Sequence, residues 1–142
     1  MLTPAECGRR CRVAFGELFK PQWGSYRLRG RKMLFESNTV FALYSDFHAG
    51  QSQWWYSVPK SKWEDWQTQS LVILMKESSE VYYVLLNPKE SITLLSRCGP
   101  HYSNVDKYVT IRRPTSGGEI YFVEWSEFPL LSRLCSLQVP GV

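Results

Sequence analysis

The residue types best able to do chemistry in this sequence are cations near its start. Arg27, Arg29, Arg31 and Lys32 lie within one short stretch. Residues 1–33 carry eight Lys or Arg against two acids, a charge of +6, whereas residues 34–142 carry nine against eleven, a charge of −2. Cations concentrated in one segment indicate an anionic partner, with nucleic acid first and acidic lipid or protein second, and binding to nucleic acid is favoured because neutralised phosphates release counterions. The alternative is a solvated basic segment without a partner.

Aromatic side chains are the second set of candidates. They make up 15% of the chain and include six tryptophans, more than the core of a small domain requires. Unpaired bases stack on such rings for roughly 1–3 kcal/mol each. Trp54 and Trp55 are consecutive, so in a strand they cannot face the same core. One of them is exposed, covered by a second layer or bound to a ligand, although helices on both faces of a sheet would bury both.

These two sets define one predicted nucleic-acid surface. Two lysines beside Trp63 and a dibasic strand end extend it. The predicted nucleic-acid-binding residues are Arg27, Arg29, Arg31, Lys32, Trp54, Trp55, Tyr56, Lys60, Lys62, Trp63, Arg112 and Arg113.

Four side chains have the types that bind zinc. Cys7 and Cys11 are four apart on a predicted helix, and Cys98 and His101 form a Cys-x2-His pair. Zinc takes four such ligands in a tetrahedron, but structural sites more often draw both pairs from loops. The alternative is that the helical cysteines are small apolar core residues. We therefore predict no metal site.

Catalytic motifs are scarce. The chain has two histidines, and it lacks a glycine-rich phosphate loop, a Gly-x-Ser-x-Gly elbow and a His-Glu-x-x-His helix. A magnesium-dependent nuclease would draw on Glu17, Glu36 and Asp46 with Lys76, yet no Glu-x-Lys follows an Asp at suitable spacing. We expect no catalysis and no cofactor, with a metal-dependent nuclease as an alternative.

The elements that must position these residues follow from periodicity and turn chemistry. Apolar residues at spacings of three and four predict a helix over residues 3–19, and Pro21 with Gly24 predicts a turn or linker over 20–24. Alternation predicts a basic hairpin over residues 26–35 that turns at Arg29 to Lys32. Further strands are expected over residues 39–44, 53–58, 71–76, 81–86, 105–112 and 119–125.

Two more helices carry capping signals. Ser61 and Glu64 match a capping box for a short helix through residue 69, and Asn87 with Glu90 caps a helix over residues 88–97. Strands joined by tight turns favour an α+β fold: a single domain, mostly antiparallel β-sheet, with two or three short helices. Within it we distinguish a basic N-terminal helix and linker (1–24), a β-rich core (25–128) and an amphipathic tail (129–142).

The tail is a separate signal. Leu130, Leu131, Leu134 and Leu137 recur at helical spacing after Pro129. Either this segment is a helix that closes the core of its own domain, or it presents a stripe to a protein partner. A protein-interaction or assembly module is therefore a second alternative function.

One stretch carries a resemblance. Residues 41–86 contain a strand that ends Leu43-Tyr44-Ser45, a polar loop, then Trp54-Trp55-Tyr56-Ser57-Val58 before a capped helix and an apolar hairpin. This pattern resembles the small β-rich accessory modules of bacterial restriction and defence endonucleases. The sequence lacks the Asp and Glu-x-Lys set of a nuclease core, so the resemblance implies recognition of DNA rather than cleavage.

The chain has no apolar run long enough to span a membrane, since the longest, Leu71 to Met75, has the length of a strand. Glu6 and three arginines precede any long apolar stretch, which is unlike a secretory or transit leader. We expect a cytoplasmic protein without membrane contact. Its predicted function is non-catalytic binding of nucleic acid, DNA before RNA.

Overall fold

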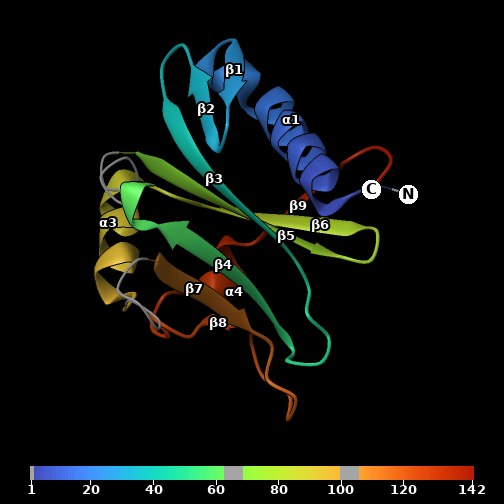
Figure 1. The fold of residues 1–142 in the computed structure, drawn as a ribbon, viewed down its shortest axis with the longest axis vertical. Helices are drawn as coiled ribbons and strands as arrows, with labels where there is room; N and C mark the ends of the chain where they lie inside the picture. The colour runs from blue at the N-terminus through green and yellow to red at the C-terminus, as the bar shows by residue number, and fades with distance from the viewer. Residues whose placement is uncertain (1, 63–68, 100–105) are drawn as a thin grey trace.

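The computed structural model describes residues 2–62, 69–99 and 106–142, which form an α+β domain built on two sheets (Figure 1). A six-stranded sheet has the order β1-β2-β3-β5-β6-β9, and a three-stranded sheet has the order β4-β7-β8. The strands of the larger sheet are β1 (Tyr26–Arg29), β2 (Lys32–Phe35), β3 (Thr39–Asp46), β5 (Ser70–Glu77), β6 (Glu80–Leu86) and β9 (Cys135–Leu137). Those of the smaller sheet are β4 (Gln53–Pro59), β7 (Asp106–Arg112) and β8 (Tyr121–Phe122). The helices are α1 (Pro4–Trp23), η1 (Lys60–Lys62), α3 (Pro88–Arg97) and α4 (Leu130–Arg133).

Helix α1 extends past its predicted end. The Thr3 hydroxyl caps it by accepting from the Glu6 amide, and it runs to Trp23, so the predicted turn over residues 20–24 is wrong. Proline removes one hydrogen bond, here in the last turn, where the loss is least disruptive. One face of the helix carries a stack of three rings, in which the centroid of Phe19 lies 4.5 Å from that of Phe15 and 4.5 Å from that of Trp23. This packing outweighs the loss of the hydrogen bond.

The basic hairpin is confirmed. Strands β1 and β2 pair with Arg29 opposite Lys32, and Gly30 has a φ of 60°, which the first turn residue of a tight hairpin requires. The alternation places Tyr26 and Leu28 in the cluster beneath α1. Arg27 and Arg29 therefore lie on the opposite face of the sheet.

The larger sheet is mixed. Of the seven strand pairings within the described residues, six are antiparallel and one, β3 with β5, is parallel. A parallel neighbour needs a crossover, and here the chain leaves β3, forms β4 in the other sheet and returns to β5. The prediction of a mostly antiparallel α+β fold is confirmed.

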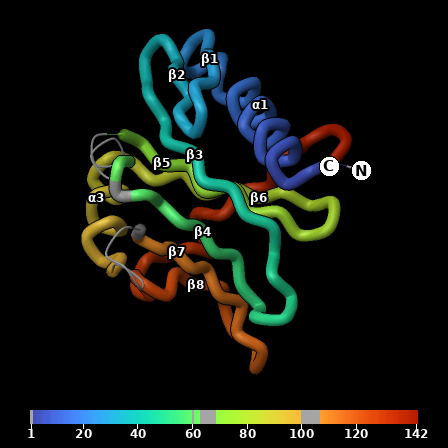
Figure 2. The backbone as a smooth tube through the Cα atoms, in the orientation of Figure 1, coloured from blue at the N-terminus to red at the C-terminus, as the bar shows by residue number. Residues whose placement is uncertain are grey.

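Figure 2 shows the backbone of these layers. Two apolar clusters hold them together. One lies between α1 and the larger sheet; its members include Cys11, Phe15, Met33, Val40 and Val72. The other lies between the two sheets and beneath α3; its members include Phe41, Trp54, Ile73, Leu94 and Val109. The larger sheet is therefore buried on both faces along its central strands, which explains why β5 reads as a continuous apolar run.

The predicted capping box of α3 is confirmed, because the Asn87 and Glu90 side chains each accept from the other residue's amide. Of the helix predicted over residues 61–69, the structure shows η1 at its start, and residues 63–68 lie outside the described part. The strand predicted over residues 119–125 is shortened to β8.

The predicted tail helix is wrong beyond its first turn. Helix α4 ends at Arg133, and β9 then pairs antiparallel with β6. Pairing with the β6 edge satisfies backbone groups that a helix would leave uncovered. Arg133 fixes the change of direction through a bidentate contact with Glu90 at 2.7 and 2.9 Å and a hydrogen bond to the Leu85 carbonyl at 2.8 Å. Among the described residues, no helix is both long and apolar enough to cross a membrane.

Candidate nucleic-acid interface

A basic groove gathers four of the predicted cations. Arg29, Arg31 and Lys32 of the hairpin and Lys62 of η1 line a pocket of about 560 Å³, with Gly30, Phe41 and Pro59 completing its lining. Among the residues that the structure describes, no carboxylate belongs to that lining. Two segments that lie thirty positions apart in the sequence, at Lys32 and Lys62, thus converge on one concave, positively charged surface.

The strand register explains this convergence. Arg29 is opposite Lys32, and Lys32 is opposite Phe41, so the three residues share one row across β1, β2 and β3. Phe41 is buried in the cluster between the sheets, and the hairpin lies beyond the edge of the smaller sheet (Figure 1). The end of β4, with Pro59, forms the opposite wall of the basic groove.

Arg31 occupies the turn of the hairpin and is held on both sides. Its carbonyl accepts from the Ala42 amide at 2.8 Å, and its Nη1 donates to the Ser57 carbonyl at 3.0 Å. These bonds tie the hairpin to β3 and β4, which belong to different sheets. Arg31 as a whole residue is still exposed, and among the described residues its guanidinium uses one donor.

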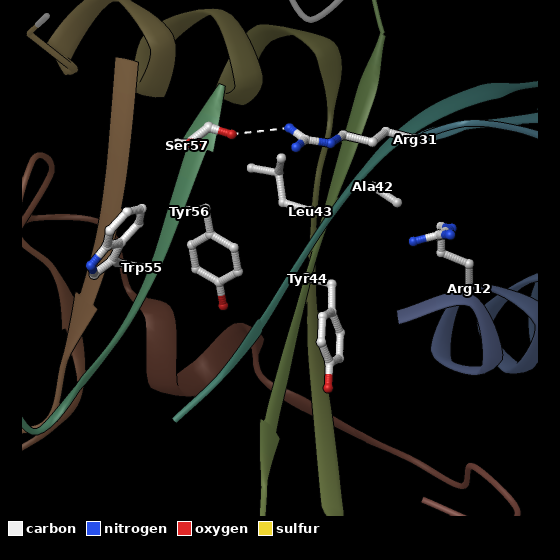
Figure 3. A pocket seen from close by; sticks show the side chains of 8 residues that line it. All are labelled: Arg12, Arg31, Ala42, Leu43, Tyr44, Trp55, Tyr56 and Ser57. Atoms are coloured by element: carbon white, nitrogen blue, oxygen red, sulfur yellow. Dashed lines mark hydrogen bonds between the residues drawn. The ribbon is translucent and has the colours of Figure 1, made fainter. Parts of the chain in front are cut away.

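A second cavity adjoins the basic groove through Arg31. This β3-edge pocket has a volume of about 270 Å³, and Figure 3 shows its lining residues: Arg12, Arg31, Ala42, Leu43, Tyr44, Trp55, Tyr56 and Ser57. Arg12 reaches it from α1, on the side opposite β4. Burial lowers the pKa of Arg12, and the nearby charges of Arg9 and Arg31 lower it further.

The three aromatic residues of β4 divide between core and surface. Trp54 is 1% exposed and donates from Nε1 to the Lys76 carbonyl at 3.0 Å, and Tyr56 is 3% exposed and donates to the Leu74 carbonyl at 3.2 Å. The prediction that Trp54 and Tyr56 are surface ligands for nucleic acid does not hold, because the packing of the sheets covers both side chains. Trp55 is 40% exposed and packs edge to face on Tyr108. Its ring extends away from Arg12 in Figure 3.

The dibasic strand end does not join the basic groove. Arg113 forms a bidentate ion pair with Glu77 at 2.7 and 2.8 Å and covers the rings of Phe47 and Trp54, so its role is structural. The same contact lowers the pKa of Glu77 and raises that of Arg113. Arg112 is exposed on β7 and donates to the Gln53 side chain at 3.2 Å.

Three further predicted residues stand apart. Arg27 is exposed but lines a different pocket, near Glu17 and Lys20. Lys60 opens η1, and its side chain is not described. Trp63 lies outside the described residues.

The cysteines do not converge. Cys11 is in the cluster beneath α1 and Cys98 is in the cluster between the sheets, so the larger sheet separates them. Both thiols have a pKa raised by burial to about 12, as expected of buried apolar residues. His101 is outside the described residues, among which no three His, Cys, Asp or Glu gather as metal ligands.

The carboxylates considered for a nuclease are dispersed as well. Tyr26 donates to Glu17 at 2.8 Å, and the Ser25 amide donates to Glu36 at 3.2 Å. Asp46 accepts from Tyr44 at 2.9 Å and pairs with Lys76 at 3.6 Å. Each acid is engaged locally, and no metal-binding group forms from them within the described part of the chain.

Sequence reasoning missed Arg12. It belongs to the basic first third of the chain, but it lies between Cys11 and Val13 on a helix whose other cations point to solvent. Only the packing of α1 against β3 shows that it borders a pocket.

No protein family model, no curated protein and no solved structure matches this chain.

Proposed function

We propose that this protein binds nucleic acid, DNA before RNA, through the basic groove and without catalysis. The observation that carries the proposal is the convergence of Arg29, Arg31, Lys32 and Lys62 on one groove to which the described residues contribute no carboxylate. Cations placed this close raise the local positive potential, and a phosphate backbone is the polymer that matches such a row.

The chemistry of the four groups suits phosphate oxygens. Arginine presents a planar fork of donors that matches two oxygens of one phosphate, while lysine acts as a compact charge. Arg29 and Arg31 are exposed, and neither forms an ion pair among the described residues. Phosphate contacts of this kind fix the position of a nucleic acid without reading its sequence.

Trp55 is the proposed contact for bases or sugars. Of the three aromatic residues of β4, it alone is exposed, and it borders the β3-edge pocket next to Ser57, to which Arg31 is bonded. A base that stacks on the indole would contribute roughly 1–3 kcal/mol.

The test is direct binding across a salt series. Labelled single-stranded and double-stranded DNA and RNA are titrated with the protein between 50 and 200 mM salt, with fluorescence anisotropy as the readout. We expect dissociation constants below about 100 µM at low salt that weaken steeply as salt rises. Affinity weaker than this for every ligand, or affinity that does not depend on salt, would contradict the proposal.

The same preparation tests the nuclease alternative. Plasmid nicking is measured with magnesium and with EDTA, and we expect no cutting in either. EDTA-sensitive cutting that Glu36→Ala or Asp46→Ala abolishes would favour a nuclease instead.

The second candidate function is an assembly module that uses the tail. Leu131 is 50% exposed on α4, and β9 is an edge strand of the larger sheet. Edge strands and exposed leucines are surfaces that partner chains use. A mass above that of the monomer in light scattering, unchanged by nuclease treatment and lowered by Leu131→Ser, would support this function.

A further inference from the structure

The β3-edge pocket lies where β3 is no longer paired with β2. Strand β2 pairs with β3 only from Thr39 to Phe41, and the Arg31 carbonyl takes the Ala42 amide. Beyond that point no described strand pairs with β3 on this side. The pocket therefore has strand edge as its floor, α1 with Arg12 on one wall and β4 on the other (Figure 3).

The charge in this pocket is not neutralised. Arg12 and Arg31 both line it, no carboxylate does, and neither arginine forms an ion pair within the described residues. The acid on the same strand, Asp46, is already engaged by the Tyr44 hydroxyl and by Lys76. Two arginines thus line one small cavity to which the described part of the chain supplies no counter-charge.

Hydrogen-bond donors are also left over. The Arg12 Nε is buried and has no hydrogen-bond partner. Arg31 donates one hydrogen bond, to the Ser57 carbonyl, out of the five N–H donors that a guanidinium has. The buried Nε is not accessible to a ligand, but the other guanidinium donors of Arg12 and Arg31 make no further hydrogen bond among the described residues, and a ligand with several acceptor oxygens would supply partners for them.

Arg12 packs against its own helix and against β3. A methyl group built on Gly8 would meet the Tyr44 ring at 3.3 Å and Arg12 Nη1 at 3.4 Å, so helix, ring and guanidinium are packed closely. The Arg12 guanidinium therefore lies close to its own helix and to the Tyr44 ring of β3, beside the strand edge.

We propose that the β3-edge pocket binds a terminal phosphate monoester, so that the protein holds the phosphorylated end of a nucleic acid whose backbone lies in the basic groove. A phosphate monoester has a charge near −2 at neutral pH and three terminal oxygens, which match two unneutralised guanidinium groups. Arg31 lines both cavities, so the end of a chain in the basic groove is adjacent to the pocket. The part of this inference that places a nucleic-acid strand in the basic groove rests on the proposed function. The binding of a phosphate monoester in the pocket does not.

The experiment compares ends of one oligonucleotide. A single-stranded DNA is prepared with a 5′-phosphate, with a 3′-phosphate and with hydroxyls at both ends, and each competes against a labelled strand. Inorganic phosphate and a nucleoside monophosphate are titrated separately, with tryptophan fluorescence and NMR shifts as readouts. We expect one phosphorylated end to bind roughly ten- to hundred-fold more tightly than the hydroxyl end.

Two variants locate the effect. Arg12→Gln is expected to remove the preference for the phosphorylated end while it leaves the binding of the hydroxyl strand and its salt dependence unchanged. Arg10→Gln removes an equal charge from the same helix, at a side chain that contacts the Pro140 carbonyl and lines neither cavity, so it is expected to keep the preference. Thermal unfolding of both variants verifies that they are folded, and Arg12→Lys supplies a second reading if Arg12→Gln does not fold.

The outcomes separate this inference from the proposed function. Equal binding of all three strands, together with no response to inorganic phosphate or the monophosphate, overturns the pocket assignment and leaves the basic groove standing. Binding of the two small phosphates without binding of any strand supports the pocket and overturns the function proposed for the basic groove. A preference that Arg10→Gln abolishes and Arg12→Gln preserves would overturn the assignment to this pocket.

Discussion

Replacing Arg29 by glutamine gives the sharpest test of the basic groove. Arg29 is exposed at the end of β1 and lines the basic groove but not the β3-edge pocket, and its side chain has no hydrogen-bond or ion-pair partner among the described residues. The substitution removes one charge without removing a structural contact. We therefore expect thermal stability within about 0.5 kcal/mol of the unchanged protein.

The magnitude follows from the number of cations. Each phosphate neutralised on a single strand contributes about −0.7 to the slope of log affinity against log salt, so four cations predict a slope of about −2.8. Between 50 and 200 mM salt, this slope lowers affinity about 50-fold. With Arg29→Gln three cations remain, the slope becomes about −2.1 and the same change of salt lowers affinity about 18-fold.

The assay is anisotropy of a labelled single strand at four or more salt concentrations, with Arg10→Gln as the control of equal charge. Lys62→Gln, on the other wall, is expected to reduce the slope by the same amount, and the double variant by twice that amount. If Arg29→Gln and Arg10→Gln give the same slope, binding follows net charge and not the basic groove, and the reasoning is refuted.

Further predictions concern the fold and its pH dependence. Trp54→Ala is expected to lower the free energy of unfolding by about 3–5 kcal/mol in urea titrations, because it empties a buried site, whereas Trp55→Ala is expected to keep the fold and to weaken nucleic-acid binding. A Trp55→Ala variant with unchanged binding would exclude stacking on this ring. The hydrogen bonds from Arg113 lower the pKa of Glu77 below the ordinary value of a glutamate, so the interaction stabilises the fold above that ordinary pKa and is lost as pH falls through the lowered one. Glu77→Gln is expected to flatten acid unfolding in that window, and an unchanged profile would contradict this expectation. Deletion of residues 129–142 removes β9 and its buried leucine, and we expect loss of cooperative unfolding by circular dichroism; a truncated protein that still unfolds cooperatively would show that the tail is dispensable.

Local chemistry was sufficient to predict much of the fold. The capping box at Asn87 and Glu90, the alternation in the hairpin and the turn at Gly30 are interactions between residues close in sequence, so their patterns are visible in the chain itself. Pro21 misled the prediction, because its local preference for a helix end was outweighed by the stacking of Phe15, Phe19 and Trp23.

The tail shows the same limit. The spacing of its leucines fits a helix, but an unpaired edge of β6 and the Glu90 carboxylate compete for this segment, and the result is one helical turn followed by a strand. Neither competitor is near the tail in sequence. The periodic pattern therefore left open whether the segment packs on its own domain or on a partner, and in either case it indicated a helix where the structure forms one turn and a strand.

The amino-acid sequence by itself determined the α+β class, the basic hairpin and the rule that Trp54 and Trp55 face opposite ways, because alternation and turn chemistry act between neighbours along the chain. Tertiary structure decided which indole is buried, brought Lys62 across to the hairpin and placed Arg12 at the open edge of β3. These outcomes depend on how two sheets and a helix pack, and packing joins residues whose separation in sequence leaves no local pattern.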